Sequence, residues 1–451
     1  MDLHGRKALV VGLARTGLAT AAFLKSKGSI VSASEMKPKE EIGERVQELE
    51  GMGLSNMEWG GHQVGTFLSQ DLIVVSPGVD LKIDPIQEAL KKGIQVISEI
   101  ELAYGFIHIP IIAVTGTNGK TTTTHLIGEM LKEEGKKVGV GGNVGDPLIL
   151  FAEGGDRWEV LVVEISSFQL EAIEDFRPRI SVLLNITEDH LDRYARYEEY
   201  IEAKARIFVN QNSGDVAILN GDDPIVTGLG KKVKAAKILF SLKTKPQEGA
   251  FPNGEKIILR LKGKEENYSL AKAPLKGVHN VENMMAALTA ARVYGASKRA
   301  IENVLNRFEG LEHRLELVRE INGIRFFNDS KGTNVGSVVK SLQSFSDPVI
   351  LIAGGKDKNG DLSPLRGLIK GRVKQLILIG EAKGRMKREW GALTDTTLTQ
   401  TLEEAVLFAY QKAKRGDVVL LSPACSSFDM FKDYKERGRV FKDAVHRIST
   451  K

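Results

Sequence analysis

The segment Ile111–Thr124 reads IIAVTGTNGKTTTT and decides the fold class. It opens on an uninterrupted apolar run, which is typical of a strand buried on both faces of a parallel sheet. A glycine-rich turn follows, and the threonines after it are expected to open a helix. Backbone N–H groups of such a turn, with the helix N-terminus behind them, form a ready anion site. The segment therefore predicts a phosphate-binding loop between a buried strand and a helix.

Within this loop Lys120 is expected to reach the β- and γ-phosphates of a nucleotide, and the Thr121 hydroxyl to ligate Mg²⁺. In the usual pattern the first glycine stands five residues before the second, but here Val114 occupies that place. An ordinary turn followed by a helix cap is the alternative interpretation. The predicted nucleotide contacts in this segment are Gly116, Thr117, Asn118, Gly119, Lys120, Thr121 and Thr122.

The same succession of a short apolar run and a loop rich in Gly, Ser or Asn recurs along the chain. Continuous apolar runs indicate mostly parallel sheets covered by helices, and hence an α/β fold. Because ligands collect beyond the carboxyl ends of such strands, the loops after them are the expected sites of chemistry. The runs lie at Ala8–Val11, Leu72–Val75, Ile111–Val114, Val160–Val163, Ile180–Leu184, Val216–Leu219, Val349–Ala353, Leu376–Ile379 and Val418–Leu421.

Two boundaries divide the chain into three predicted domains. One lies near Ser98–Pro110, where helix-like sequence leads to the strand of the phosphate loop, and the other lies near Gly310. The predicted domains are therefore 1–98, 99–310 and 311–451.

Two further stretches of the chain carry structural expectations only. The stretch Asn280–Arg307 reads as helical, and about 243–276 alternates short polar and apolar pieces. The second stretch predicts an insertion that bears a β-hairpin.

The composition is ordinary for a soluble globular protein, with 42% hydrophobic and 27% charged residues in 451. The 63 basic and 58 acidic residues include no basic tail or Lys/Arg block, so no nucleic-acid partner is expected. No apolar run approaches the ~18 residues of a membrane span. The single cysteine, Cys425, excludes an internal disulfide framework, and we interpret it as a packing residue. We expect a cytoplasmic enzyme, without a membrane partner, that acts as a monomer.

The N-terminal string VVGLARTG follows the first apolar run and spaces its small residues as Gly12-x-Ala14-x-x-Gly17. This spacing is similar to a dinucleotide-binding fingerprint, and the acidic residue Glu35 follows in VSASEM. From these residues alone, an NAD-binding domain stays an open alternative.

Several loops together resemble one protein family. TGTNGKTT, EISSFQLE around Glu164, NITEDHLDRY around His190 and KGVHNVENMMAALTAA are similar to segments of the Mur ligase and folylpolyglutamate synthase superfamily. The resemblance covers almost the whole chain. The strings NDSKGTN and LLSPACSSFDMFKDY are the most discriminating, because they resemble the D-glutamate-adding branch.

This resemblance implies a Rossmann-like N-terminal domain for a UDP-sugar, a central P-loop ATPase-like domain with a mostly parallel sheet, and a Rossmann-like C-terminal domain for the amino acid. It implies ATP-dependent addition of D-glutamate to UDP-N-acetylmuramoyl-L-alanine through an acyl phosphate, in peptidoglycan precursor synthesis, with two Mg²⁺ ions. ATP would serve as co-substrate.

The resemblance also assigns metal and catalytic roles. Glu164 would be a magnesium ligand, His190 a residue of a second metal site, and Lys204 a carbamylated lysine. From the residues alone, Glu164 could be a surface acid and His190 a structural residue. Lys204 could equally be a lysine whose stem packs on a helix while its ammonium reaches water.

The remaining site residues are implied in the same way. Asn280 and Asn283 would lie near adenine, with a helix-capping pair as the alternative; Arg314 would approach the phosphates and Asp329 the ribose, with Lys331 beside them. Thr333, Lys358 and Ser427 would hold the carboxylates of D-glutamate. Phe428 and Tyr434 would lie nearby, although the family pattern has Phe where Tyr434 stands. The residues implied for the UDP-sugar are Thr16, Glu35, Ser76, Gly78 and Asn143.

Two competing interpretations stay open. One is a sister ligase that adds a different amino acid, against which NDSKGTN and SPACSSFDMF argue. The other is a nucleotide-binding regulator that has lost catalysis, against which the joint presence of Lys120, Glu164, His190 and Lys204 argues.

Overall fold

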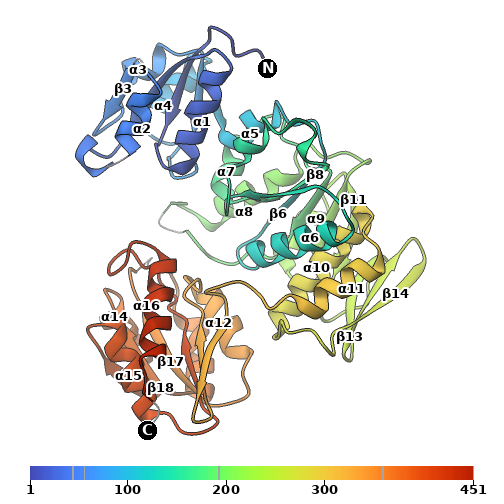
Figure 1. Ribbon diagram of the computed structural model, residues 1–451, viewed down its shortest axis with the longest axis vertical. Helices are drawn as coiled ribbons and strands as arrows, with labels where there is room; N and C mark the ends of the chain where they lie inside the picture. Colours follow the sequence, from blue (N-terminus) through green and yellow to red (C-terminus); the bar gives the residue numbers. More distant parts are fainter. Residues whose placement is uncertain (43–44, 55, 191–192, 358–359, 450–451) are drawn as a thin grey trace.

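A computed structural model of the chain describes residues 1–42, 45–54, 56–190, 193–357 and 360–449. These residues form three sheets, each covered by helices and each drawn from one continuous part of the sequence (Figure 1). Each apolar run predicted as a strand lies in a strand, with differences of a few residues at the ends. No helix in the described ranges is long and apolar enough to cross a membrane.

The first sheet has five parallel strands in the order β3-β2-β1-β4-β5. This order places the loops after β1 and β4 next to each other. They border the crevice at which the order of successive strands changes direction across the sheet. The strands are β1 (Lys7–Val11), β2 (Ile30–Glu35), β3 (Asn56–Trp59), β4 (Leu72–Val75) and β5 (Gln95–Ser98). The helices are α1 (Arg15–Ser26), η1 (Lys39–Glu41), α2 (Arg45–Gly51), α3 (Val64–Leu68) and α4 (Asp84–Lys91).

The central sheet has nine strands in the order β14-β13-β12-β11-β10-β9-β6-β8-β7. The pairs from β7 to β12 are parallel, and the predicted hairpin is antiparallel and extends the sheet at one edge. The strands are β6 (Ile111–Thr115), β7 (Val138–Gly142), β8 (Val160–Glu164), β9 (Ile180–Leu183), β10 (Val216–Asn220), β11 (Ala236–Phe240), β12 (Gly249–Asn253), β13 (Lys256–Leu261) and β14 (Lys264–Ser269).

Helices cover both faces of the central sheet. On one face α6 packs against α10 and α11, and their apolar residues form one buried cluster with the strands. The helices of this domain are α5 (Glu99–Tyr104), α6 (Lys120–Glu133), η2 (Leu148–Phe151), η3 (Gly155–Arg157), α7 (Ser167–Glu171), α8 (Tyr197–Ala205), η4 (Arg206–Phe208), α9 (Pro224–Gly230), α10 (Val278–Tyr294) and α11 (Lys298–Arg307).

The third sheet has the order β15-β16-β20-β17-β18-β19, and all its pairs are parallel except the β15–β16 hairpin. Its strands are β15 (Glu316–Ile321), β16 (Ile324–Asn328), β17 (Val349–Gly354), β18 (Val373–Ile379), β19 (Asp395–Leu398) and β20 (Val418–Leu421). Its helices are α12 (Val335–Gln343), η5 (Ser363–Leu365), α13 (Arg366–Arg372), α14 (Lys383–Trp390), α15 (Leu402–Lys412) and α16 (Tyr434–His446).

The apolar cores connect the three parts unequally. One buried cluster runs from the first sheet through α5 into the other face of the central sheet, and Phe23 of α1 meets Phe106 with ring centroids 5.1 Å apart. The buried clusters of the third sheet contain described residues of that sheet's own part of the chain alone. The C-terminal part is therefore joined to the central part by a linker and by polar contacts, rather than by a shared core.

Candidate active site

The predicted phosphate loop connects β6 to α6, and its backbone depends on two glycines. Gly116 and Gly119 have φ angles of 148° and 88°, in the region that favours glycine. Gly119 is the residue before α6, so the N–H groups of the first helical turn lie beside the loop, as anion binding requires. The Thr117 N–H donates to the Asn185 carbonyl at 2.8 Å and anchors the loop to the chain after β9.

An added side chain at Gly119 should disrupt nucleotide binding. A Cβ there would lie 2.2 Å from the Asn283 Oδ1 atom, on a backbone with a φ of 88°. We expect Gly119→Ala to raise the KM for ATP about tenfold to a hundredfold, because the loop or α10 must shift. Gly135→Ala is a matched control, since Gly135 has the same φ but no atom within 4 Å of an added Cβ. Steady-state kinetics with thermal unfolding would test this, and equal KM values in the two variants would contradict it.

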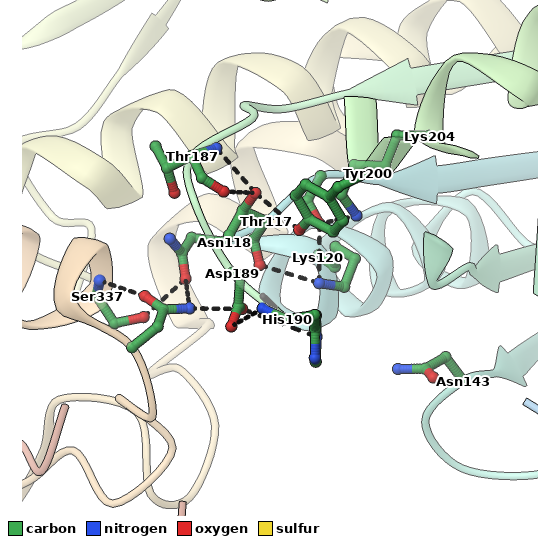
Figure 2. A network of polar contacts seen from close by, with 12 residues as sticks. Thr117, Asn118, Lys120, Asn143, Thr187, Asp189, His190, Tyr200, Lys204 and Ser337 are labelled. Carbon is green, nitrogen blue, oxygen red and sulfur yellow. Dashed lines mark hydrogen bonds and ion pairs between the residues drawn. The ribbon is translucent and has the colours of Figure 1, made fainter. Parts of the chain in front are cut away.

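Lys120 is the first residue of α6, and its side chain folds back over the loop. Its Nζ donates to the Gly116 carbonyl at 2.9 Å and to the Thr117 carbonyl at 3.0 Å (Figure 2). This places a positive charge at the turn where phosphate oxygens would meet the backbone N–H groups.

Glu164 ends β8, the strand next to β6, and its carboxylate is buried beside the loop. The Asn143 side chain donates to Glu164 Oε1 at 2.9 Å. Burial by itself would raise the pKa of Glu164. Four neighbouring groups together outweigh the effect of burial and hold this pKa below its ordinary value. They are the positive charges of Lys120 and Arg314, the hydroxyl of Thr121 and the amide of Asn143. The carboxylate is therefore ionised at neutral pH, as a metal ligand must be.

Arg314 belongs to the third part of the chain but reaches the phosphate loop of the second. Its Nη2 donates to the Thr121 Oγ1 atom at 2.5 Å. The guanidinium therefore lies beside the first turn of α6.

Lys204 lies on α8 and is 2% exposed, which is rare for a lysine. Its Nζ donates to the Gly116 carbonyl at 3.0 Å and lies 4.6 Å from the centre of the Tyr200 ring. Burial lowers the pKa of the Lys204 amine well below its ordinary value, and the charge of Lys120 lowers it further. A neutral amine is the form that reacts with CO₂, so this environment supports the carbamate prediction.

His190 follows β9 and has a φ of 57°, an uncommon value for a residue with a side chain. The carboxylate of Asp189 accepts a hydrogen bond from the His190 N–H at 3.0 Å, and its Oδ2 lies 3.8 Å from the imidazole Nε2. The imidazole packs edge-on against Phe168, with ring centroids 4.8 Å apart. Such backbone conformations persist where surrounding contacts impose them, and they cluster at functional sites.

These side chains line one cavity of about 220 Å³. The Oε2 atom of Glu164 is buried and has no hydrogen-bond partner among the described residues, so it is available to a cation.

The described part of the chain contains no cluster of three or more His, Cys, Asp or Glu side chains placed to hold a metal. A magnesium site here would therefore combine Glu164 with other oxygens, such as the Thr121 hydroxyl, phosphate oxygens or a carbamate at Lys204, and Mg²⁺ favours such a set. The residues of the cavity named above are Lys120, Asn143, Glu164, Phe168, Asp189, His190, Tyr200, Lys204 and Arg314.

A second cavity of about 70 Å³ borders the same loop and brings together the predicted nucleotide residues. The two asparagines of α10 bond to each other, with Asn283 Nδ2 donating to Asn280 Oδ1 at 3.2 Å. The carboxylate of Asp329 accepts from the hydroxyls of Ser341 and Ser422, both at 2.7 Å, while burial raises its pKa to about 6. The predicted residues that line this cavity are Asn118, Gly119, Thr122, Asn280, Asn283, Arg314, Asp329 and Lys331.

The residues predicted to bind D-glutamate follow neighbouring strands of the third sheet at their carboxyl ends. Thr333 lines the 220 Å³ cavity. Ser427 is 2% exposed, whereas Phe428 is 68% exposed. Tyr434 begins α16, and the Nζ of Lys331 lies 3.9 Å from the centre of its ring. Lys358, the predicted cation of this set, lies outside the described residues.

The residues predicted to bind the UDP-sugar lie at the carboxyl edge of the first sheet, with one exception. Glu35 accepts from the Leu13 N–H at 2.7 Å, and the Ser76 hydroxyl donates to the Gly12 carbonyl at 2.7 Å, so both side chains support the loop after β1. Asn143 instead follows β7 and contacts Glu164. The remaining two residues of this set, Thr16 and Gly78, lie in α1 and after β4.

Sequence reasoning did not single out several polar residues that complete the site. The side chain of Asn185 accepts from the Asn118 N–H at 2.8 Å and donates to the Asn118 carbonyl at 3.0 Å. The Tyr200 hydroxyl lies 3.0 Å from Thr117 Oγ1. Asn185 and Asn334 stand inside the strings NITEDH and NDSKGTN, which was the one available signal for them.

An arginine that reaches from one sheet onto the phosphate loop of another is the arrangement of an enzyme that closes around its nucleotide. The fold and the site thus define a three-domain, P-loop nucleotide-dependent enzyme. Its sequence matches the Mur ligase MurD-like N-terminal domain over residues 6–98, the Mur ligase middle domain over 114–291 and the Mur ligase glutamate ligase domain over 313–425. The chain belongs to the Mur ligase family.

Two similar sequences are both named UDP-N-acetylmuramoylalanine–D-glutamate ligase. The protein from Geotalea daltonii is 53% identical over 100% of this chain and 99% of its own length. The protein from Geobacter metallireducens is 50% identical over 100% of this chain and 99% of its own.

Solved structures share the fold at lower identity. A pseudomurein peptide ligase type C from Methanothermus fervidus aligns with a TM-score of 0.62 at 20% identity, over 99% of this chain and 100% of its own. The MurF ligase from Thermotoga maritima, in complex with ADP, aligns with a TM-score of 0.62 at 16% identity, over 99% of each chain.

Proposed function

We infer that this protein is an ATP-dependent ligase that adds D-glutamate to UDP-N-acetylmuramoyl-L-alanine in peptidoglycan precursor synthesis. Relatives at about 50% identity over the full length carry that name. The observation that carries the inference is the meeting of Lys120, Glu164 and Arg314 around one phosphate loop. We further propose that it acts in the cytoplasm as a monomer.

The first chemical step would make the substrate carboxylate reactive. A carboxylate is a poor acyl electrophile, and transfer of the γ-phosphoryl group of ATP converts it to an acyl phosphate with a good leaving group, releasing ADP. Lys120 and Arg314 would neutralise the charge that develops on the transferring group. When bound, Mg²⁺ held by Glu164 and Thr121, with His190 and a carbamylated Lys204 at a second site, would supply further charge neutralisation and orientation.

The second step would form the amide. Thr333, Ser427 and Lys358 would hold the two carboxylates of D-glutamate, so that its amine attacks the acyl phosphate and expels inorganic phosphate. Holding the C-terminal domain against the phosphate loop brings the amine close and keeps water out.

The nucleotide would span the two cavities that share the loop. Its phosphates would meet the first turn of α6, and its adenosine end would lie toward Asn280, Asn283 and Asp329. The UDP-sugar would occupy the carboxyl edge of the first sheet, near Thr16, Glu35, Ser76 and Gly78, with Asn143 between that edge and Glu164.

Phosphate release by the purified protein, measured with ATP, Mg²⁺ and UDP-N-acetylmuramoyl-L-alanine, would test this function. Added amino acids should stimulate release when D-glutamate is supplied, and other D- and L-amino acids should have little effect. Stimulation by a different amino acid alone would indicate a sister ligase, and no amide product with any amino acid would indicate a non-catalytic protein.

A further inference from the structure

Besides Arg314, the C-terminal domain contacts the phosphate loop with side chains at the start of α12. Asn334 is the residue before this helix, and its Nδ2 donates to Asp189 Oδ2 at 2.9 Å and to Asn118 Oδ1 at 3.4 Å. One turn later, the Ser337 hydroxyl donates to the same Asn118 oxygen at 2.7 Å. Figure 2 shows Asn118, Asp189 and Ser337 facing one another across the domain boundary.

The central-domain partners are themselves fixed parts of the site. Asn118 is the tip of the phosphate loop, and its backbone is bonded on both sides to the Asn185 side chain. Asp189 uses its other carboxylate oxygen to hold the backbone of His190. Asn334 is thus bonded to two side chains whose own positions are held within the central domain.

The backbone of α12 also approaches side chains of the central domain closely at this junction. A Cβ added to Gly336 would lie 3.2 Å from the Thr187 hydroxyl and 3.3 Å from the Asn118 side chain. The two domains share no apolar cluster among the described residues, so polar contacts set the distance between them. Other polar contacts between the domains join Arg314 to Thr121, Lys340 to Glu282 and Ser344 to His279.

We propose that Asn334 is a positioning residue that fixes the amino-acid-binding loop relative to the phosphate loop. This proposal rests on the proposed function of the protein as a D-glutamate ligase. Asn334 directly follows Thr333, which is predicted to bind D-glutamate, so its two hydrogen bonds set the distance from the amine to the acyl phosphate. With this contact in place the amine attacks before water does. Without it, water hydrolyses the acyl phosphate to carboxylate and inorganic phosphate, and ATP is consumed without amide formation.

Asn334 has a second role that the experiment must separate from the first. Its Oδ1 accepts from the Ser337 N–H at 2.8 Å and caps α12. Asn334→Ser keeps a good capping hydroxyl but removes the amide donor that reaches Asp189 and Asn118. Thr401→Ala is the matched control, because it removes the cap of α15, which lies in the same domain away from the site.

The experiment measures ADP formed per amide formed, with the KM values for D-glutamate and ATP, in the wild type and both variants. For Asn334→Ser we expect a KM for D-glutamate about tenfold higher, more than one ADP per amide, and a KM for ATP within about twofold of the wild type. Thr401→Ala should keep the wild-type values. Asn334→Asp, which keeps the cap but sets a carboxylate against Asp189, should show the larger loss.

Wild-type coupling in Asn334→Ser would overturn the proposal. An equal rise in the KM values of ATP, the UDP-sugar and D-glutamate would also overturn it, because that pattern indicates a general structural defect. If the wild type forms amide with another amino acid, the proposed substrate is wrong, and the same ratio measured with that amino acid still tests Asn334.

Discussion

Lys120→Ala should lower kcat/KM for amide formation by about a thousandfold, at the upper end of what removal of one charge-stabilising group costs. The Nζ of Lys120 lies between the carbonyls of Gly116 and Thr117, at the turn where the β- and γ-phosphates would bind. Lys204 also donates to the Gly116 carbonyl, but it does so from α8 and with a strongly lowered pKa, so it does not replace the positive charge of Lys120.

Two further variants make this result specific. Lys132→Ala, on the exposed side of the same helix, removes a surface ion pair with Glu129 and should leave activity unchanged. Lys120→Arg keeps the charge but replaces a compact ammonium by a planar guanidinium, so it should recover little activity. Initial rates of ADP and amide formation, with circular dichroism to show that each variant is folded, provide the measurement. Amide formation by Lys120→Ala at the wild-type rate would refute the phosphate-loop assignment.

The central architecture could be predicted from the sequence because buried parallel strands are apolar without interruption. Two of the strands that the sequence analysis missed are of a different kind. β7 reads VGVGG and β2 reads IVSASE, so neither shows a continuous apolar run. The single helical stretch expected at Asn280–Arg307 is two helices, because the chain turns at Gly295 with a φ of 122° after α10 ends.

The first glycine motif also acquires a structural explanation that its spacing alone did not provide. A Cβ at Gly17 would lie 2.0 Å from the Gly12 carbonyl oxygen, so glycine is needed for α1 to pack against the loop after β1. That close approach is required whichever nucleotide-like ligand binds there. The spacing by itself therefore left open a choice between NAD and a UDP-sugar.

Within the site, the predictable residues are those that lie directly after a strand or inside a phosphate loop. Asn334 and Asp189 are 145 positions apart, and they meet because two domains dock. Local pattern carries no information on such a meeting. The burial of Lys204 was not visible in EEYIEAKARIF either, because its partner Gly116 lies far away in the sequence of the same domain, and a solvated lysine was the simpler interpretation.

Lys204→Ala should reduce the rate of amide formation by about a hundredfold to a thousandfold, and small carboxylic acids added to the assay should restore part of it. The amine of Lys204 and that of Lys120 both donate to the Gly116 carbonyl, so two ammonium groups would repel each other there. The lowered pKa of Lys204 relieves that repulsion, because the neutral amine carries no charge. Reaction with CO₂ goes further and places a negative charge opposite Lys120, where a second Mg²⁺ would also be attracted.

Lys204→Met separates this chemistry from packing. The methionine stem should still fill the space against Tyr200 but cannot form a carbamate, so we expect it to be folded and as inactive as the alanine variant. In the wild type, ¹³C-labelled bicarbonate should give a carbamate signal by NMR that is absent from both variants, and removal of CO₂ should lower activity reversibly. An unmodified Lys204 in fully active enzyme, or full activity in Lys204→Met, would show that this lysine acts as a buried structural amine.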